Sequence, residues 1–240
     1  YNHPVYIFMP DWASKERVSI MKAYGATVKL ISKEEGGFLK CIEEARKLAE
    51  EKNGFLANQF SNKDNMLAHY ETTAPEIIEQ STEELYGFVS GVGTGGTLMG
   101  TGMKLKEKYK DLKIVAIEPD KMPIISQGRK ITQHKIEGIG DDFVPELLDK
   151  SKIDDVILVD DDDAINMSRR LAKELGLGVG ISSGANFIGT ILLEAKIQKP
   201  VVTIFVDDNK KYVSTDLCKE TKKKEGYISS DIKLIDYEIM

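Results

Sequence analysis

The sequence predicts an α/β fold with mainly parallel sheets and with helices on both faces of the sheets. Short apolar runs alternate along the chain with longer segments that have helical periodicity. This alternation is typical of βαβ units, in which a crossover helix joins two parallel strands. A glycine-rich loop, GVGTGGTLMG at 91–100, directly follows the apolar run LYGFVS. We interpret this point as a junction between a strand and a helix.

The predicted strands are short apolar runs, as expected for strands that are buried inside a parallel sheet. The first, VYIFMP, begins almost at the start of the chain. The strands are expected at 5–10, 26–31, 55–60, 85–90, 113–119, 156–160 and 201–206.

The predicted helices lie between these strands, at 14–23, 38–52, 65–80, 97–108, 164–175 and 183–194. Ser14 is the expected N-cap of the first helix, and Asn53-Gly54 is a stop signal for the second. The acidic run at 160–163 precedes a helix, where negative charge favours the helix dipole. It lacks the residue order of a calcium loop, so we interpret it as a cap and expect no metal site.

Composition bounds the class of protein. The 240 residues allow one large domain or two small ones. A hydrophobic content of 41% and a charged content of 30% are ordinary for a soluble globular protein. The net charge of −6 argues against nucleic acid or an anionic membrane as partner. Cys41 and Cys218 form no CxxC pair, and this cysteine usage is typical of a cytoplasmic protein.

The glycine loop has the composition of a phosphate cradle. Backbone N–H groups at a helix N-terminus attract anions, and glycine allows the backbone to approach them closely. The loop lacks the lysine of a P-loop. Glu118 lies near the spacing of the acid that binds ribose in dinucleotide folds, so NAD remains open. The alternative is a glycine-rich turn without a ligand.

Five further segments occur in a fixed order with this loop. They are MPDWASKERVSIMKAYGA (9–26), QFSNKDNMLAHYETTAPEI (59–77), VAIEP (115–119), EGIGDDFVP (137–145) and GISSGAN (180–186). Together with GVGTGGT they resemble the cysteine synthase and cystathionine β-synthase family, and the resemblance covers nearly the whole chain. It implies fold type II of the pyridoxal 5′-phosphate (PLP) enzymes, similar to tryptophan synthase β. We expect a smaller domain, incomplete here, at 1–60 and a larger PLP-binding domain at 61–240.

The resemblance assigns roles to individual residues. The PLP phosphate is expected on the loop residues Gly93, Thr94, Gly95, Gly96 and Thr97. Ser182 matches the serine that hydrogen-bonds the pyridine nitrogen, although a helix N-cap is the alternative. Gln59 matches a glutamine of the substrate-carboxylate site, with a polar strand end as the alternative. His69 is interpreted as a structural histidine.

The family's Schiff-base lysine and its Thr/Ser-Gly-Asn-Thr loop lie in a segment before the point where this sequence starts. Neither motif is found here, and the chain opens without methionine. We therefore expect an N-terminally truncated fragment of an enzyme, inactive by itself because the lysine is needed for catalysis. A non-catalytic module that binds PLP or an amino acid is the alternative.

The segment GIGDDFVP differs from the GIGAGFxP that is typical of sulfide-using cysteine synthases. In the family this loop faces the substrate. Water is a weaker nucleophile than sulfide and needs a base, whereas a carboxylate repels anionic sulfide. We hypothesise that Asp141 or Asp142 activates water, so that cysteine yields serine and hydrogen sulfide. The alternative is that the two aspartates cap a turn or a helix.

The resemblance implies β-replacement or elimination through an aminoacrylate, on L-cysteine or O-acetylserine. Classical cysteine synthase and cystathionine-type synthase activities remain alternatives. An unrelated α/β phosphate binder is disfavoured by Ser182 and the flanking motifs. Relatives are homodimers, and some cysteine synthases bind serine acetyltransferase, so both partners are expected by analogy only. We expect a small amino-acid substrate and no nucleic acid or membrane partner.

Overall fold

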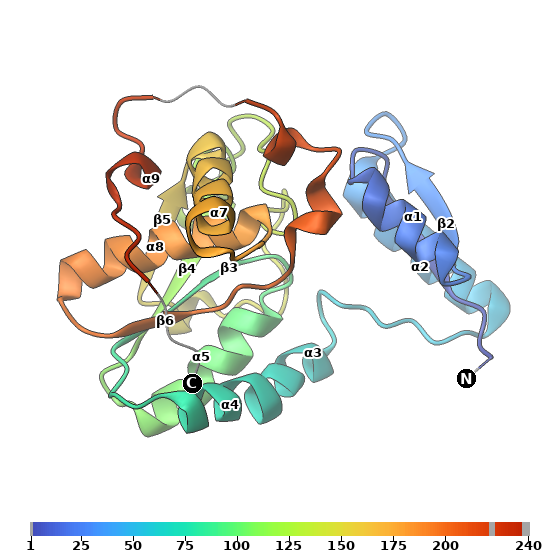
Figure 1. Ribbon diagram of the computed structural model, residues 1–240. Helices are drawn as coiled ribbons and strands as arrows, with labels where there is room; N and C mark the ends of the chain where they lie inside the picture. Colours follow the sequence, from blue (N-terminus) through green and yellow to red (C-terminus); the bar gives the residue numbers. More distant parts are fainter. Residues whose placement is uncertain (1, 221–223, 237–240) are drawn as a thin grey trace.

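The computed structural model describes residues 2–220 and 224–236, which form two parallel sheets (Figure 1). The small sheet pairs β1 (Tyr6–Pro10) with β2 (Thr27–Ile31) in parallel. The larger sheet has the order β5-β4-β3-β6, with every pair parallel. Its strands are β3 (Gly87–Gly91), β4 (Lys113–Pro119), β5 (Asp155–Val159) and β6 (Val201–Thr203). The predicted α/β class with parallel sheets is confirmed.

The helices fall between these strands. They are α1 (Lys15–Ala23), α2 (Gly37–Lys52), α3 (Lys63–Ala68), α4 (Ala74–Gln80), α5 (Gly96–Lys108), α6 (Ile124–Gln127), α7 (Asp161–Leu175), α8 (Ile181–Ile197) and α9 (Ile228–Asp231). A π-helical turn, η1 (His69–Thr73), joins α3 to α4, and the 3₁₀ turns are η2 (Lys150–Lys152), η3 (Asn209–Tyr212) and η4 (Asp216–Cys218).

Helices cover both faces of the larger sheet because its strands are apolar on both sides. Val89 and Ile117 belong to the core cluster that contains α7 and α8. Phe88 and Ile114, the alternate residues of the same two strands, belong to the cluster that contains α5 and part of α4. Side chains alternate between the two faces of a strand, so each strand contributes to two cores. Figure 1 shows α7 and α8 on one side of this sheet and α4 and α5 on the other.

The N-terminal unit, which consists of β1, β2, α1 and α2, packs through aromatic and polar contacts against the larger body that contains the four-stranded sheet. The rings of Phe38, Phe60 and Phe143 form a cluster with centroid separations of 5.1–6.4 Å. Ser214 donates from its hydroxyl and its N–H group to the Glu16 carboxylate, at 2.7 and 2.9 Å. An extended connector joins α2 to α3 (Figure 1). A domain boundary at residue 60 stays a prediction.

Two strand predictions were wrong, the first entirely and the second in its extent. Residues 55–60 form no strand: Asn58 has a left-handed backbone, with φ of 48°, and Phe55 is 90% exposed. Among the described residues, no strand pairs with this connector. The strand predicted at 201–206 ends at Thr203, because side chains of α8 form hydrogen bonds with the backbone of the residues that follow. Asn186 Nδ2 binds the Ile204 carbonyl at 2.9 Å, and Val206 N–H donates to Ser183 Oγ at 3.1 Å.

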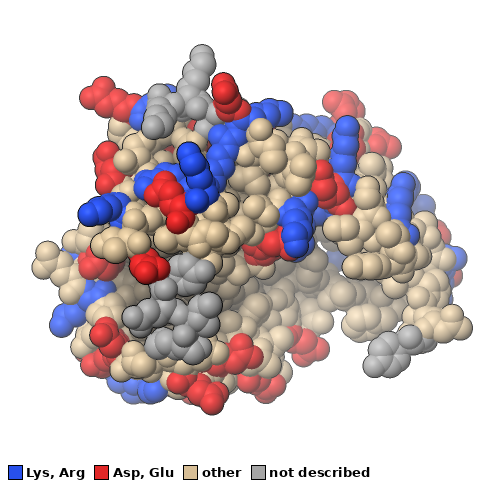
Figure 2. All heavy atoms as spheres, viewed as in Figure 1, with Lys and Arg blue, Asp and Glu red and all other residues tan. Residues whose placement is uncertain are grey.

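Charges of both signs are mixed on the face of the molecule that Figure 2 presents. Figure 2 shows Lys and Arg interspersed with Asp and Glu on the face it presents. Among the described helices, none has the length and apolar character needed to cross a membrane.

Candidate cofactor and active site

The glycine loop between β3 and α5 needs glycine for steric reasons. A Cβ atom on Gly93 would lie 2.4 Å from the Gly138 carbonyl oxygen, and one on Gly96 would lie 2.1 Å from Asn65 Oδ1. Gly95, the N-cap of α5, has φ of 86°, in the left-handed region. The bare backbone therefore lets this loop pack directly against two other segments.

The same loop presents hydrogen-bond donors that the protein does not use. Within the described residues, the backbone N–H groups of Gly93, Thr94, Gly95 and Thr97 have no acceptor. They lie at the N-terminus of the 13-residue helix α5, where the dipole favours negative charge. The predicted phosphate cradle therefore has the donors that it requires.

A cavity of about 320 Å³ opens beside this loop. Its volume lies within the range of small-molecule sites, about 300–1,000 Å³. The lining residues come from the end of β3, the glycine loop, the first turns of α8, the 137–139 segment, α1 and the segment before and in η3: Arg17, Ser90, Gly91, Gly93, Thr94, Gly95, Thr97, Glu137, Gly138, Ile139, Ser182, Asn186, Val206, Asp207, Lys211 and Tyr212. The structure thus brings four of the five predicted loop residues together with Ser182.

Ser182 lies inside the first turn of α8, not at its cap. The helix begins at Ile181, and Gly180 is its N-cap. The alternative that Ser182 is a helix N-cap is therefore wrong. Its side chain lines the cavity, and its hydroxyl has no hydrogen-bond partner among the described residues. The neighbouring Ser183 hydroxyl is instead occupied by the N–H group of Val206. Ser182 is free to bind a ligand group.

Gln59 and Gly96 do not line this cavity. Gln59 is exposed, and its carbonyl accepts a hydrogen bond from Asn65 Nδ2 at 2.8 Å. The same amide lies 2.9 Å from Thr94 Oγ1. Asn65 therefore links the Gln59 segment to the glycine loop, and a substrate role for Gln59 stays a prediction.

His69 supports the loop through Thr97. Its Nε2 atom lies 3.0 Å from Thr97 Oγ1, and its Nδ1 atom lies 3.0 Å from Thr73 Oγ1. Burial lowers the pKa of His69. Both ring nitrogens have partners within the fold, which supports the interpretation of His69 as a structural histidine.

The EGIGDD segment lies against the glycine loop. Gly140 donates its N–H group to the Val92 carbonyl at 3.0 Å. Gly138 and Gly140 have φ of 94° and 75°, conformations that favour glycine. Gly138 and Ile139 line the cavity, whereas Asp141 and Asp142, which follow them, do not. The two aspartates therefore lie next to the cavity-lining part of this segment.

Asp141 and Asp142 occupy different environments. Asp141 is half-buried, and burial, together with the nearby charge of Asp142, raises its pKa to about 6. Asp142 has a side chain 42% exposed, 3.5 Å from Lys130 Nζ. No described residue donates a hydrogen bond to either carboxylate. The alternative that they cap a turn or a helix is therefore wrong.

Sequence reasoning missed a polar network among the residues that line the cavity. Arg17 of α1 forms an ion pair with Glu137. Its Nη2 atom donates to the Tyr212 hydroxyl at 2.7 Å and lies 3.7 Å from Asp207 Oδ2. Burial raises the pKa of Glu137, and Arg17 opposes that rise. The network joins the N-terminal unit to the larger body, and its sequence signal was the position of Arg17 within the segment MPDWASKERVSIMKAYGA.

Two acidic features of the sequence have structural roles. Glu118 is buried and accepts hydrogen bonds from the N–H groups of Ile125 and Ser126, at 2.8 and 3.0 Å. It is therefore not available to bind a ribose. Asp160 caps α7 by accepting from two N–H groups of the acidic run. The cap interpretation is confirmed, and the described residues contain no group that could hold a metal ion.

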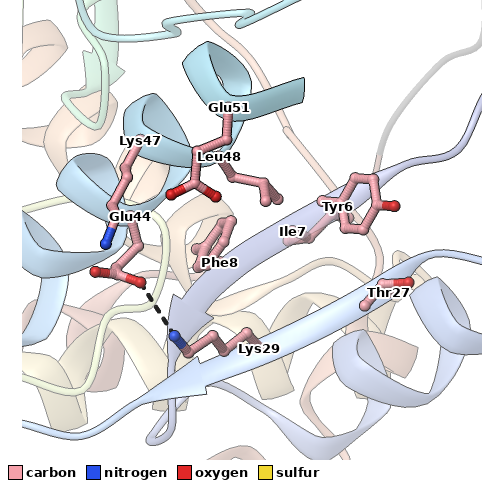
Figure 3. Close-up of a pocket in the computed structure, with 9 residues that line it drawn as sticks. All are labelled: Tyr6, Ile7, Phe8, Thr27, Lys29, Glu44, Lys47, Leu48 and Glu51. Carbon is pink, nitrogen blue, oxygen red and sulfur yellow. Dashed lines mark hydrogen bonds and ion pairs between the residues drawn. The ribbon is translucent and has the colours of Figure 1, made fainter. Parts of the chain in front are cut away.

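A second cavity, of about 290 Å³, lies on the N-terminal unit (Figure 3). All nine of its lining residues come from β1, β2 and α2. Figure 3 shows Lys29 and Glu44 pointing toward one another, at 3.1 Å, across this groove. None of these nine lining residues belongs to the glycine loop, and they offer no set of unpaired backbone N–H groups like that of the loop.

The chain is similar in sequence and in structure to several known proteins. The chain is 42% identical to cysteine synthase B of Campylobacter jejuni over 87% of this chain and 70% of that protein. It superposes on a hydrogen sulfide-producing enzyme from Fusobacterium nucleatum with a TM-score of 0.91 and 48% identity, over 95% of this chain and 70% of that one. The cysteine synthase of Entamoeba histolytica gives a TM-score of 0.84 and 38% identity, over 95% and 68%.

A further structure of the Fusobacterium enzyme matches with a TM-score of 0.94 and 48% identity, over 97% of this chain and 72% of that one. It is an aspartate-to-asparagine mutant in complex with an α-aminoacrylate intermediate. The family model described as pyridoxal-phosphate dependent enzyme matches residues 1–207. The chain therefore belongs to the family of PLP-dependent enzymes that includes the cysteine synthases, and it has their fold.

Proposed function

We propose that the glycine loop and Ser182 hold PLP in the 320 Å³ cavity. The free N–H groups of the loop suit its phosphate, and the unpartnered Ser182 hydroxyl suits its pyridine nitrogen. When bound, PLP withdraws electrons from Cα of an amino acid and so assists loss of the β-substituent. A neutral serine, unlike an aspartate, does not force the ring nitrogen to stay protonated. A serine beside the ring nitrogen therefore favours β-elimination and β-replacement over transamination.

The proposed reaction converts L-cysteine and water into L-serine and hydrogen sulfide. The Cβ–S bond breaks, a Cβ–O bond forms, and the proton taken from water balances the sulfide that leaves. The observation that carries this proposal is Asp141, a half-buried carboxyl with a pKa of about 6 beside the cavity-lining segment. A base with a pKa near the working pH is suited to accept a proton from water. The 48% identity to a hydrogen sulfide-producing enzyme supports the same reaction.

Serine formation should depend on pH through Asp141. Only the ionised carboxylate accepts a proton, so the rate is expected to rise as the pH increases through about 6 and then to level off. Because the charge of Asp142 raises the pKa of Asp141, the variant Asp142→Asn should move this midpoint to lower pH. Serine measured against pH in the wild type and this variant tests the assignment. An unchanged midpoint would contradict it.

Classical cysteine synthase activity is the second candidate, favoured by the 42% identity to cysteine synthase B. It would use O-acetylserine and sulfide, and a cystathionine-type synthase would use a thiol amino acid. The carboxylates of Asp141 and Asp142 disfavour anionic sulfide at the loop. Comparison of serine formed from cysteine with cysteine formed from O-acetylserine and sulfide separates the two candidates.

A non-catalytic module that binds PLP is a third candidate, and the mass of the protein distinguishes it. The whole gene product is incubated with PLP and reduced with borohydride, and its intact mass is recorded. An enzyme of this family is expected to gain one covalent pyridoxyl group. PLP binding without any adduct would favour the binding module. We further propose a cytoplasmic homodimer, by analogy with the family, and its mass in solution is the corresponding measurement.

A further inference from the structure

Gly140 is hydrogen-bonded through both its N–H group and its carbonyl. Its N–H group donates to the Val92 carbonyl at 3.0 Å, and its own carbonyl lies 2.7 Å from His134 Nε2. Packing around it is tight: a Cβ atom on Gly140 would lie 2.6 Å from Pro119 Cγ and 3.1 Å from His134 Nε2. The residue immediately before Asp141 is therefore clamped between the glycine loop and His134.

The protonation state of His134 follows from its surroundings. A carbonyl oxygen only accepts hydrogen bonds, so Nε2 must carry a proton. The Nδ1 atom is buried and has no partner among the described residues. Burial lowers the pKa of His134, so the ring is neutral at physiological pH. Asp161, Lys121 and Lys130 are the charged groups that act on it. His134 thus presents one fixed donor to the loop.

We propose that His134 is a positioning residue that orients Asp141 by holding the carbonyl of Gly140. Gly138 and Gly140 both have positive φ. Because glycine can adopt many backbone conformations, the segment could move if it had no anchor. Asp141 forms no hydrogen bond with any described residue that would fix it. Its placement relative to the cavity therefore depends on the clamp at Gly140. This inference rests on the proposed role of Asp141 as the base for water.

The competition between water and a thiol tests the proposal. The whole gene product, loaded with PLP, is given L-cysteine together with 2-mercaptoethanol, and serine and the thioether product are both quantified. A thiol needs less activation than water, so only serine formation depends strongly on the orientation of Asp141. His134→Phe, which lacks a donor, should lower the ratio of serine to thioether by about tenfold or more, since small misplacements of catalytic groups are costly. His134→Gln, which can place an amide near the position of Nε2, should retain most of the ratio.

A second measurement is independent of activity. Hydrogen exchange of the backbone amides at 138–142 should accelerate in His134→Phe and not in His134→Gln, while α8 stays unchanged. His134→Asn, whose amide reaches only the position of Nδ1, should behave like His134→Phe and serves if that variant does not fold. The exposed His3, changed to phenylalanine, is the matched control.

The outcomes separate this inference from the proposed function. No serine from the wild type would contradict the proposed reaction itself. Serine from the wild type, with an unchanged ratio and unchanged exchange in the folded His134 variants, would overturn the role of His134 alone. A lowered ratio with faster exchange at 138–142, rescued by glutamine, is the result that we expect.

Discussion

Asp141→Asn should lower the rate of serine formation from L-cysteine by about 10²- to 10⁴-fold, the usual contribution of a general base. The amide keeps the size of the side chain but cannot accept the proton of water. Formation of the thioether from an added thiol should change far less, because a thiol needs less activation than water and this step does not need Asp141. The measurement is the initial rate of serine formation, with thioether formation as the internal reference.

Asp142→Asn is the matched control, since Asp142 is exposed and lies near Lys130. It should retain most of the serine-forming rate above the midpoint of the pH profile. Replacement of both aspartates, by Asp141→Ala with Asp142→Gly, recreates the small loop of sulfide-using relatives. Serine formation at the wild-type rate in this double variant would show that these carboxylates do not activate water.

Gly93→Ala should weaken PLP binding by roughly 5- to 150-fold. The added methyl group would lie 2.4 Å from the Gly138 carbonyl oxygen, which is backbone and cannot rotate away. The glycine loop must then separate from the 137–142 segment, at a typical overpacking cost of about 1–3 kcal/mol. PLP affinity is measured by equilibrium dialysis of the purified protein against PLP.

Gly54→Ala provides the control for this substitution. A Cβ atom there meets no atom closer than 3.9 Å, so affinity should match the wild type. Equal PLP affinities for Gly93→Ala and the wild type would contradict the proposal that this loop, packed against the Gly138 carbonyl, holds the cofactor.

The alternation of strands and helices was predictable because it depends on local periodicity. The strand β4 was placed at its exact bounds from the run KIVAIEP. The strand predicted at 55–60 was wrong because an apolar run becomes a strand only where a partner strand lies beside it. The sequence shows apolar character but not the neighbours that a segment meets in the fold.

The glycine loop and Ser182 were predictable as a group, because their motifs occur in a recognisable order. The different environments of Asp141 and Asp142 could not be predicted. The two residues are adjacent and identical in type, and they differ only in burial and in contact with Lys130. The Arg17 network was also missed. It brings together α1 and residues 120 or more positions away, and such contacts leave no local pattern.

The central claim is that water, activated beside the cavity, replaces the sulfur of cysteine. It is tested most directly with the whole gene product, PLP and L-cysteine in water enriched in oxygen-18. We predict L-serine that carries one oxygen-18 in its hydroxyl group, together with an equal amount of hydrogen sulfide. Hydrogen sulfide accompanied by pyruvate and ammonia, without labelled serine, would contradict the claim.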